Sequence, residues 1–343
     1  MNRSGRRLVV LSVATICGMS ATPKTALADD VATFYRSKSI SVIIPSAPGG
    51  GYDRYGRLVQ RHMGRFIPGS PTLIARNVPG AGGVVQANQL YTTAPRDGTA
   101  FGIIQHSIPF RPILDPREVR YKVDGFRWLG SVSPITTLAI VNKNAPIRSV
   151  EDLFQKELII GASGGTTLYL PSTVNSVLGT KFRIIKGYKN TGDILLAMAR
   201  NEVAGLVGVG LSSLLGSKSA KNTDYRILFQ MAYSKHPDIK EVPLVQDFAR
   251  TPEDKAVMET IFASFSIGRS FVTPVIPDDR LAALRVAFKK TVEDAKFRGD
   301  AKKSKAEVSY VSPDDIGRII ASVYAQPKPI IDRAAKAFVG TGN

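Results

Sequence analysis

The segment SAPGGGYDRYG, residues 46–56, places three consecutive glycines between an apolar run and a helical pattern. The N-terminus of a helix presents N–H groups that have no partner within the helix, together with the positive end of the helix dipole. A glycine loop at this position lets an anion approach the backbone closely. Gly49, Gly50 and Gly51 are therefore candidate anion-binding residues, and a tight turn from strand to helix is the alternative explanation for them.

Apolar runs and helical patterns alternate on both sides of this segment. The runs at residues 39–46, 72–77 and 99–105 are typical of buried strands. Between these runs, apolar residues recur at spacings of three and four in residues 52–66 and 84–91, which predicts two helices. The order strand, helix, strand, helix, strand predicts a mostly parallel sheet with right-handed crossovers.

A second series of the same kind follows, and the chain from residue 278 onward has mainly helical patterns. Its strands are predicted at residues 136–143, 157–163, 182–188, 203–210 and 225–232. In open α/β sheets, ligands bind at the carboxyl ends of the strands. Glycines gather at several of those ends, in residues 49–51, 80–83, 161–165, 187–192 and 208–210.

Residues 1–28 have the features of an export signal. Three arginines precede an apolar run at residues 8–18, and the small residues Ala26 and Ala28 predict cleavage before Asp29. The run is too short to span a bilayer, and no later stretch reaches the roughly 20 apolar residues of a transmembrane helix. We therefore expect a soluble protein in the periplasm, exported by the general secretory route or, given the arginine pair at residues 6–7, by the twin-arginine route.

The length and charge narrow the possible functions. A chain of 343 residues with 43% hydrophobic residues can bury the core of two domains or of one large domain. The leader carries four basic residues and no acidic one, so its removal lowers the net charge from +18 to +14. Such a charge can attract small anions, a membrane or nucleic acid, or can simply form a solvated exterior. Because the basic residues are scattered and no nucleic-acid-binding motif is present, we expect no nucleic-acid partner.

Known cofactor and metal motifs do not match the chain. Gly51 is not followed by the Gly-Lys-Ser or Gly-Lys-Thr of a phosphate loop, and Arg54 stands where a dinucleotide-binding motif has its third glycine. The only cysteine lies in the leader, and the three histidines occur in separate contexts, which argues against a zinc site. We expect neither a metal nor another cofactor.

One motif raises the alternative of a secreted serine hydrolase. GASGG, residues 161–165, matches Gly-x-Ser-x-Gly between a predicted strand and a helix, so Ser163 would be the nucleophile. His236 and either Asp193 or Asp224 would complete a triad. A proline directly follows this histidine, and no upstream His-Gly-Gly oxyanion motif is present. These two features favour binding over catalysis.

The binding interpretation uses the same loop differently. Ser163, Thr166 and Thr167 would donate hydroxyl and amide groups to an anion. His106, directly after a predicted strand, is a further candidate ligand contact, whereas His62 lies on the apolar stripe of the first helix and is expected to pack there.

Several linked motifs resemble one protein family. IIPSAPGGGYDRYGRLV, ARNVPGAGG and APRDGTAFGII resemble the opening of the solute receptors of tripartite tricarboxylate transporters, the periplasmic Bug receptors. LGSVSPITTLAIVNK, GASGGTT and IKGYKNTGDILLAMARNEVAG continue the resemblance, which covers nearly all of the mature chain. It implies a type II periplasmic-binding-protein fold of two α/β domains with a ligand cleft between them. The first domain would comprise residues 29–135 and 231–343, and the second residues 136–230.

The resemblance also implies a function without catalysis. The protein would be a monomeric receptor that captures a small organic carboxylate and passes it to integral-membrane permease subunits, with a sensor kinase as the alternative partner. Carried over by position, the ligand-binding residues of the first domain are Gly49, Gly50, Gly51, Tyr52, Asp53, Gly80, Ala81 and Gly82. Those of the opposing domain are Ser163, Thr166, Thr167, Lys189 and Gly208.

Three of these positions call for separate expectations. Tyr52 stands where the family often has a small residue, so the pocket is either narrower or able to stack on an aromatic ligand. Ala204 stands where an acidic residue is usual, so the resemblance does not carry over a polar contact or structural hydrogen bond at that position. Asp53 would repel an anionic ligand, so the alternative role for it is to cap the helix by accepting backbone N–H groups.

Overall fold

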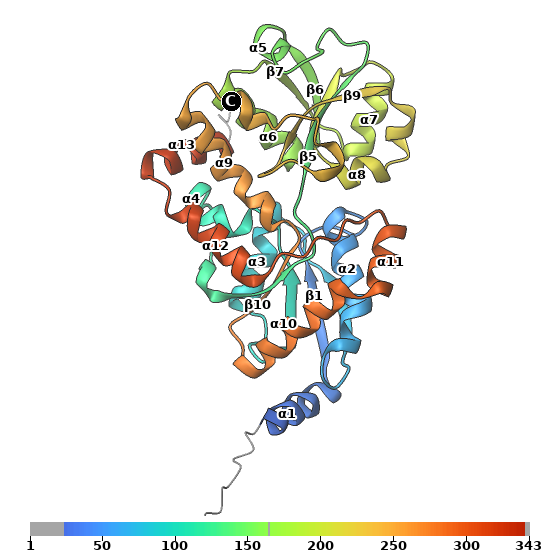
Figure 1. Cartoon of the computed structure of the whole chain (residues 1–343), viewed down its shortest axis with the longest axis vertical. Coiled ribbons are helices and arrows are strands. Elements are labelled where there is room, and N and C mark those ends of the chain that lie inside the picture. The colour runs from blue at the N-terminus through green and yellow to red at the C-terminus, as the bar shows by residue number, and fades with distance from the viewer. Residues whose placement is uncertain (1–23, 164, 340–343) are drawn as a thin grey trace, which may run out of the picture.

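Two five-stranded sheets organise the chain into two α/β domains, one above the other in Figure 1. The computed structural model describes residues 24–163 and 165–339. Most of the predicted leader, residues 1–23, and Gly164 of the GASGG motif lie outside the described residues. The prediction of an α/β fold with two domains is confirmed.

The sheet of the first domain has the spatial order β2-β1-β3-β10-β4. Its strands are β1 (Ser39–Ile44), β2 (Thr72–Asn77), β3 (Ala100–Ile103), β4 (Phe126–Ser131) and β10 (Ser270–Pro274). β1 pairs in parallel with β2 and β3, whereas β10 is antiparallel to both β3 and β4. The carboxyl ends of β1, β2 and β3 therefore share one edge, which faces the second domain (Figure 1).

The sheet of the second domain has the order β7-β6-β8-β5-β9. Its strands are β5 (Thr137–Asn142), β6 (Leu158–Ala162), β7 (Phe182–Lys186), β8 (Gly205–Gly210) and β9 (Tyr225–Met231). β6 is parallel to β7 and β8, and β5 runs against both β8 and β9.

The predicted parallel arrangement of the first three strands, β1, β2 and β3, is confirmed, and each sheet also contains one strand that runs against both of its neighbours. The chain leaves the first sheet after Ser131 and enters β5 at Thr137, which pairs with Gly210 at the end of β8. It returns to β10 at Ser270, which pairs with Ser131 at the end of β4. Both strands thus begin at the edge facing the other domain and run away from it.

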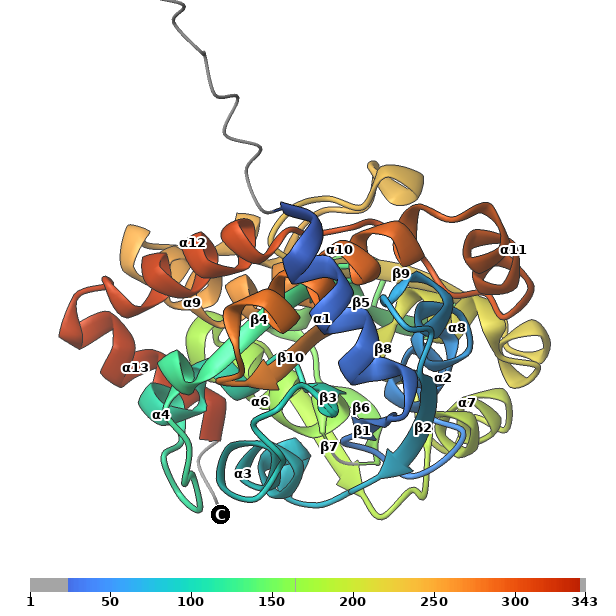
Figure 2. The same cartoon turned by 90° about the horizontal axis from the view of Figure 1, so that it is seen from below.

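Helices cover both faces of the first sheet (Figure 2). They are α1 (Lys24–Arg36), α2 (Gly51–Met63), α3 (Val84–Thr92), α4 (Arg111–Leu114), α10 (Asp278–Glu293), α11 (Ala295–Lys303) and α12 (Pro313–Tyr324). α2, α10 and α11 pack against one another, and α3 contacts β1, β3 and β10 from the other side of the sheet. The helices predicted at residues 52–66 and 84–91 correspond to α2 and α3.

The remaining helices surround the second sheet and join the two domains. They are α5 (Asp152–Gln155), α6 (Thr166–Leu178), α7 (Thr191–Ala199), α8 (Leu211–Gly216), α9 (Pro252–Ile267) and α13 (Lys328–Val339). α13 packs against α9 and contacts α4 of the first domain and α6 of the second. It therefore bridges the two domains.

An aromatic cluster holds together the strands that end at the cleft. Phe101 of β3 lies 6.2 Å from Phe271 of β10, and Phe271 lies 5.2 Å from Phe288 of α10, measured between ring centroids. All three side chains are fully buried. Burying a phenylalanine side chain contributes roughly 1.5–3 kcal/mol, so this cluster anchors β10 between its neighbours.

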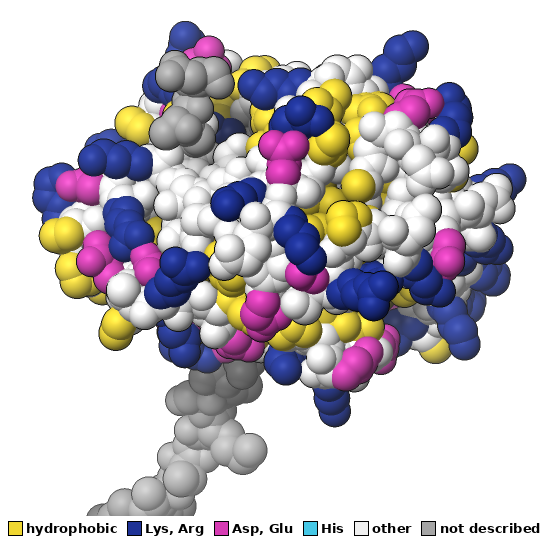
Figure 3. Space-filling view, turned by 90° about the horizontal axis from the view of Figure 1, so that it is seen from above, with side chains coloured by type: hydrophobic (Ala, Val, Ile, Leu, Met, Phe, Trp, Pro, Cys, Tyr) yellow, Lys and Arg dark blue, Asp and Glu magenta, His cyan; other side chains and the backbone are white. Residues whose placement is uncertain are grey.

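The end of the molecule formed by the second domain shows no purely basic surface (Figure 3). In Figure 3, which views the end formed by the second domain, lysine and arginine side chains are spread over the surface with acidic side chains between them. Within residues 24–163 and 165–339, no helix combines the length and apolarity needed to cross a membrane. Over the same residues, no group of three His, Cys, Asp or Glu side chains could hold a metal ion.

Candidate ligand-binding site

The glycine loop after β1 leads directly into α2. Gly49 has a φ of 88°, a left-handed conformation that a residue with a Cβ rarely adopts, and Gly50 is the N-cap. No side chain caps the helix, and its first internal bond runs from Arg54 N–H to the Gly50 carbonyl at 3.0 Å. In the described part of the chain, no protein acceptor receives the N–H groups of Gly51 or of the two residues after it. The N-terminus of α2 therefore offers three unpaired amides.

Asp53 ties this loop to the end of β2. Its carboxylate accepts hydrogen bonds from Gly49 N–H at 2.9 Å, Asn77 Nδ2 at 2.8 Å and Arg57 Nε at 2.9 Å. Asn77 also donates to the carbonyl of Ser46 at 2.7 Å. Burial raises the pKa of Asp53, but the hydrogen bonds from Asn77, Gly49 and Arg57 outweigh it, so the net pKa lies below the ordinary value. Asp53 thus accepts a backbone N–H from the loop before α2 and holds that loop in place, but it does not cap the helix.

The second glycine loop lies against the first. Gly80, Ala81 and Gly82 are exposed, and all three have positive φ values, with 45° at Ala81. A left-handed alanine costs about 1 kcal/mol, and such strain is concentrated at functional sites. A Cβ on the following Gly83 would lie 3.5 Å from Pro45, directly before the first loop. Both predicted loops therefore meet at the cleft edge of the first sheet.

His106 connects the two domains. Its backbone N–H donates to Tyr52 Oη at 3.1 Å, and its ring Nδ1 lies 3.0 Å from the same oxygen. The other ring nitrogen, Nε2, lies 3.1 Å from Tyr169 Oη of α6, so the imidazole joins the hydroxyl groups of Tyr52 and Tyr169. Burial, with the nearby charges of Arg269 and Arg111, lowers the pKa of His106 to about 3. The imidazole is therefore neutral.

Tyr52 is occupied by other residues of the protein. Its hydroxyl bonds to His106, and the guanidinium of Arg269 lies 4.2 Å from the centre of its ring. The side chain is 9% exposed, and burial raises its pKa. Tyr52 is therefore buried between His106 and Arg269.

In the second domain, the first turn of α6 packs on the end of β8. Thr166 Oγ1 donates to the carbonyl of Gly208 at 2.8 Å, and a Cβ on Gly208 would lie 2.4 Å from the Thr166 carbonyl. Only glycine permits that approach. Ser163 N–H donates to Thr167 Oγ1 at 2.9 Å. Lys189 is exposed, and within the described residues its side chain forms no hydrogen bond or ion pair. The structure thus gathers four of the five predicted residues.

The sequence analysis missed three residues of this arrangement. They are Arg269, Tyr169 and Arg111, which lie beside predicted site residues. A Cβ on Gly82, for example, would lie 3.0 Å from the guanidinium of Arg111. The available signal for Arg269 was its position in GRSFVTP, directly before β10. Because that strand was not predicted, the arginine was not assigned to the cleft edge.

Comparison with known proteins identifies the architecture. No family model matches the chain. A curated relative from a Pseudomonas species, described as a UPF0065 protein in the tcbD-tcbE intergenic region, is 24% identical over 259 residues, which cover 72% of this chain and 73% of the relative. A TctC solute-binding protein from Polaromonas superimposes with a TM-score of 0.64 and 18% identity, covering 87% of this chain and 99% of that one. The chain has the fold of the TctC solute-binding proteins.

A second solved structure with the TctC fold is a Rhodopseudomonas palustris protein with adipate. Its TM-score is 0.64 at 20% identity, and the match covers 87% of this chain and 97% of that one. The predicted resemblance and the type II periplasmic-binding fold are confirmed by these matches.

The serine hydrolase alternative finds no support in this TctC fold. Within the described residues, no hydrogen bond or ion pair joins Ser163 to His236, or His236 to either candidate aspartate. The side chains have other partners: Thr167 for Ser163, Glu307 for His236, Asn190 for Asp193 and Lys143 for Asp224.

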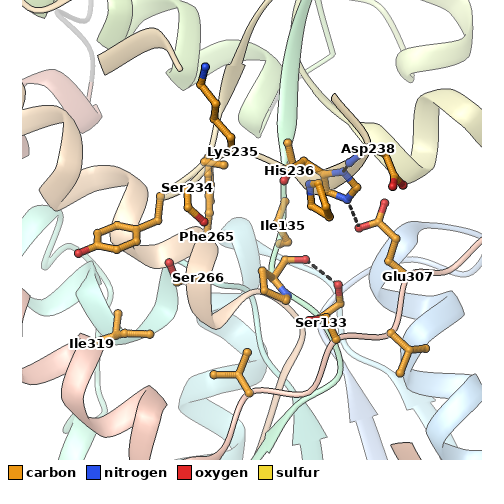
Figure 4. A pocket seen from close by; sticks show the side chains of 18 of the residues that line it. Ser133, Ile135, Ser234, Lys235, His236, Asp238, Phe265, Ser266, Glu307 and Ile319 are labelled. Carbon is orange, nitrogen blue, oxygen red and sulfur yellow. Dashed lines mark hydrogen bonds and ion pairs between the residues drawn. The ribbon is translucent and has the colours of Figure 1, made fainter. Parts of the chain in front are cut away.

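A cavity of about 650 Å³ lies beside the segments that connect the two domains of the TctC fold (Figure 4). Ser133, Ile135 and the paired side chains of His236 and Glu307, 3.5 Å apart, are among the residues that line it. Phe265 also lines it and lies 4.7 Å from the ring of His106. None of the predicted ligand residues lines this cavity, and Phe265 separates it from His106.

Proposed function

We propose that this protein is an exported, non-catalytic receptor that binds a small organic carboxylate between its two domains and delivers it to a tripartite tricarboxylate-type transporter. The observation that carries the proposal is the N-terminus of α2, where three amides without a protein acceptor lie at the edge of the first sheet that faces the second domain of a TctC fold (Figure 1). Oriented backbone amides hold an anion without a lysine. The positive net charge of the chain favours the approach of anions.

The relatives support the class of ligand. One matching structure is named a TctC solute-binding protein, and another was solved with adipate, a linear dicarboxylate. We therefore take a small mono- or dicarboxylate as the ligand of this chain.

The proposed binding site lies between the loops of the first domain and the first turn of α6. It comprises the loops 49–51 and 80–82, His106, and the group formed by Ser163, Thr166, Thr167 and Gly208. Tyr52 and Asp53 would shape the first loop. Lys189 would contribute only at the outer rim, because its side chain is exposed.

The export signal, domain bounds and partner belong to the same proposal. Residues 1–28 would direct the chain to the periplasm, where it would act as a monomer. Residues 29–135 with 231–343, and residues 136–230, would move as two domains about the connecting segments. The partner would be the membrane permease subunits of the transporter, with a sensor kinase as the alternative. The similarity to periplasmic receptors supports export and a membrane partner.

Calorimetry and thermal unfolding with a panel of acids test the function. The panel contains succinate, adipate, citrate, benzoate and phthalate, with adipamide as an uncharged control for adipate. We expect saturable binding of at least one acid and a higher unfolding temperature, since a ligand at 100 times its Kd stabilises by about 2.7 kcal/mol. The proposal would be contradicted if no acid of the panel bound, or if adipamide bound as tightly as adipate.

A further inference from the structure

Arg269 is a buried cation at the cleft edge of the first sheet. It directly precedes β10 and is 9% exposed. Its guanidinium carbon lies 4.2 Å from the ring centre of Tyr52 and 5.1 Å from that of Tyr55, so two aromatic faces hold it. Among the described residues, no aspartate or glutamate oxygen lies within 4.0 Å of its side-chain nitrogens. The two rings that hold it are neutral.

The nearby charged groups are already paired. Arg111 forms an ion pair with Asp115. Glu307 lines the same small cavity as Arg269, but its carboxylate lies 3.5 Å from His236. Removing an ion from water costs several kcal/mol unless a counter-ion replaces the lost hydration. Arg269 therefore lacks an anionic partner in the protein without ligand.

The guanidinium lies against the first residue of α2. A Cβ on Gly51 would be 3.3 Å from Arg269 Nη2, a contact tighter than ordinary packing. The unpaired amides at this end of α2 thus lie beside a guanidinium that hydrogen-bonds to Tyr52 and has no carboxylate partner among the described residues. Glycine at position 51 permits this close approach of the guanidinium to the helix N-terminus.

We propose that Arg269 pairs with a carboxylate group of the ligand, while the amides of α2 donate to the same group. This proposal rests on the proposed function and deepens it, because it requires a ligand with a full negative charge at this point. A carboxylate accepts two parallel hydrogen bonds from an arginine, and Tyr52 and Tyr55 hold the guanidinium in place.

Ligand entry requires the domains to separate. The cavity that Arg269 shares with Pro134, Thr136 and Ser212 has a volume of only about 10 Å³. That volume holds about one water molecule. Because Thr136 and Ser212 adjoin the second sheet, movement of the second domain away from β10 would open this space to a carboxylate.

Two variants and a matched control test the pairing. Arg269→Gln removes the charge, and Arg269→Lys keeps the charge but loses the planar fork. Arg280→Gln is the control, since Arg280 also stacks on an aromatic ring, that of Phe34 at 3.6 Å, and donates to the Asp97 carbonyl at 2.8 Å away from the cleft. We expect adipate, or the acid of the panel that binds most tightly, to bind about 10- to 100-fold more weakly to Arg269→Gln than to the parent. The affinity of Arg269→Lys should lie between these two. Arg280→Gln should bind as the parent does.

A ligand-side comparison separates a lost charge from a disturbed fold. The parent should prefer adipate to its monoamide and diamide, and Arg269→Gln should lose most of that preference. If Arg269→Gln does not fold, a crystal structure of the parent with adipate decides the question, with a carboxylate oxygen expected about 2.7–2.9 Å from the guanidinium. A folded Arg269→Gln that binds as tightly as the parent, or a bound carboxylate away from Arg269, overturns this inference and leaves the receptor function standing. A parent that binds no acid overturns both.

Discussion

Two buried side chains, Asp53 and His106, set the charge of the cleft at the scale of single residues. Hydrogen-bond donors keep the Asp53 carboxyl ionised even though it is buried. Burial and two arginines keep the His106 ring neutral. The negative charge of Asp53 is compensated within the loop by Arg57 and Asn77. An anionic ligand would therefore meet neutral donors and the charge of Arg269.

Replacing Asp53 by asparagine should loosen the first glycine loop. The change leaves the donors of Gly49, Asn77 and Arg57 with a weaker acceptor, and we expect a loss of about 1–2 kcal/mol in the free energy of unfolding at pH 7. Because the folded pKa of Asp53 is lowered, its contribution is present above the unfolded pKa, near 3.9, and is lost as the pH falls through the folded pKa. Urea unfolding at pH 7 and at lower pH measures both effects.

Asp278→Asn is the matched control for Asp53→Asn. Asp278 also lies in the first turn of a helix, α10, but is exposed. The control should change the stability by less than about 0.5 kcal/mol. An equal loss in both variants would show that the hydrogen bonds of Asp53 are not the cause.

The neutral state of His106 predicts a pH dependence of stability. Between the unfolded pKa, about 6.5, and the folded pKa, about 3, the unfolded chain binds a proton that the folded protein does not. The free energy of unfolding should therefore fall as the pH is lowered, by roughly 1 kcal/mol at pH 5.5. His106→Gln should lack this part of the decrease. Parallel curves of unfolding free energy against pH for the parent and His106→Gln would contradict the assignment.

At the scale of elements, α6 links the second domain to the cleft edge of the first. Tyr169 lies one turn into α6 and reaches His106, 63 residues earlier in the chain. Its ring also lies 4.9 Å from Phe338 of α13, the helix that bridges the domains. This contact and the small cavity beside Arg269 describe a closed arrangement of the two domains.

Removing the hydroxyl of Tyr169 should favour the open arrangement. Tyr169→Phe loses one interdomain hydrogen bond, which contributes about 1 kcal/mol, or roughly a fivefold change in the ratio of closed to open molecules. Small-angle X-ray scattering without ligand should give a larger radius of gyration for this variant, and ligand should reduce the difference. Tyr324→Phe is the control, because Tyr324 donates to the Pro109 carbonyl within the first domain at 2.8 Å. Identical scattering from Tyr169→Phe and the parent would show that this hydrogen bond does not hold the two domains together.

At the scale of the whole molecule, the predicted leader ends inside a helix. α1 begins at Lys24, whereas the proposed cleavage precedes Asp29. The residues that anchor α1 to the first domain, Val31 and Tyr35, are buried and lie after the cleavage point. Export processing would therefore leave the anchored part of α1 in place.

Mass spectrometry of protein recovered from the periplasm should find a chain that begins at Asp29. A chain of residues 29–343 should unfold within about 2 °C of the full-length protein, since it keeps both buried anchors. An N-terminus beyond Tyr35, or a large loss of stability on truncation, would refute the proposed cleavage site.

Much of this architecture follows from local sequence patterns. β1, β2 and α2 agree closely with the predicted runs. The reason is that the buried face of a strand or helix requires apolar residues at regular spacings in the sequence. Linked motifs also placed the glycine loops at one edge of the sheet. β10 was missed, since SFVTP is short, ends in proline and is a strand only through pairing with β3 and β4, more than 100 residues earlier.

The sequence by itself therefore determined the two series of strands and helices, the glycine loops at their ends and the resemblance to a receptor family. Only the tertiary structure placed His106 in contact with both Tyr52 and Tyr169, and Arg269 beside the first residue of α2. These contacts join residues 54 to more than 200 positions apart. The physical reason is that periodicity reports which face of an element is buried, whereas the neighbour of a buried charge depends on how distant elements pack.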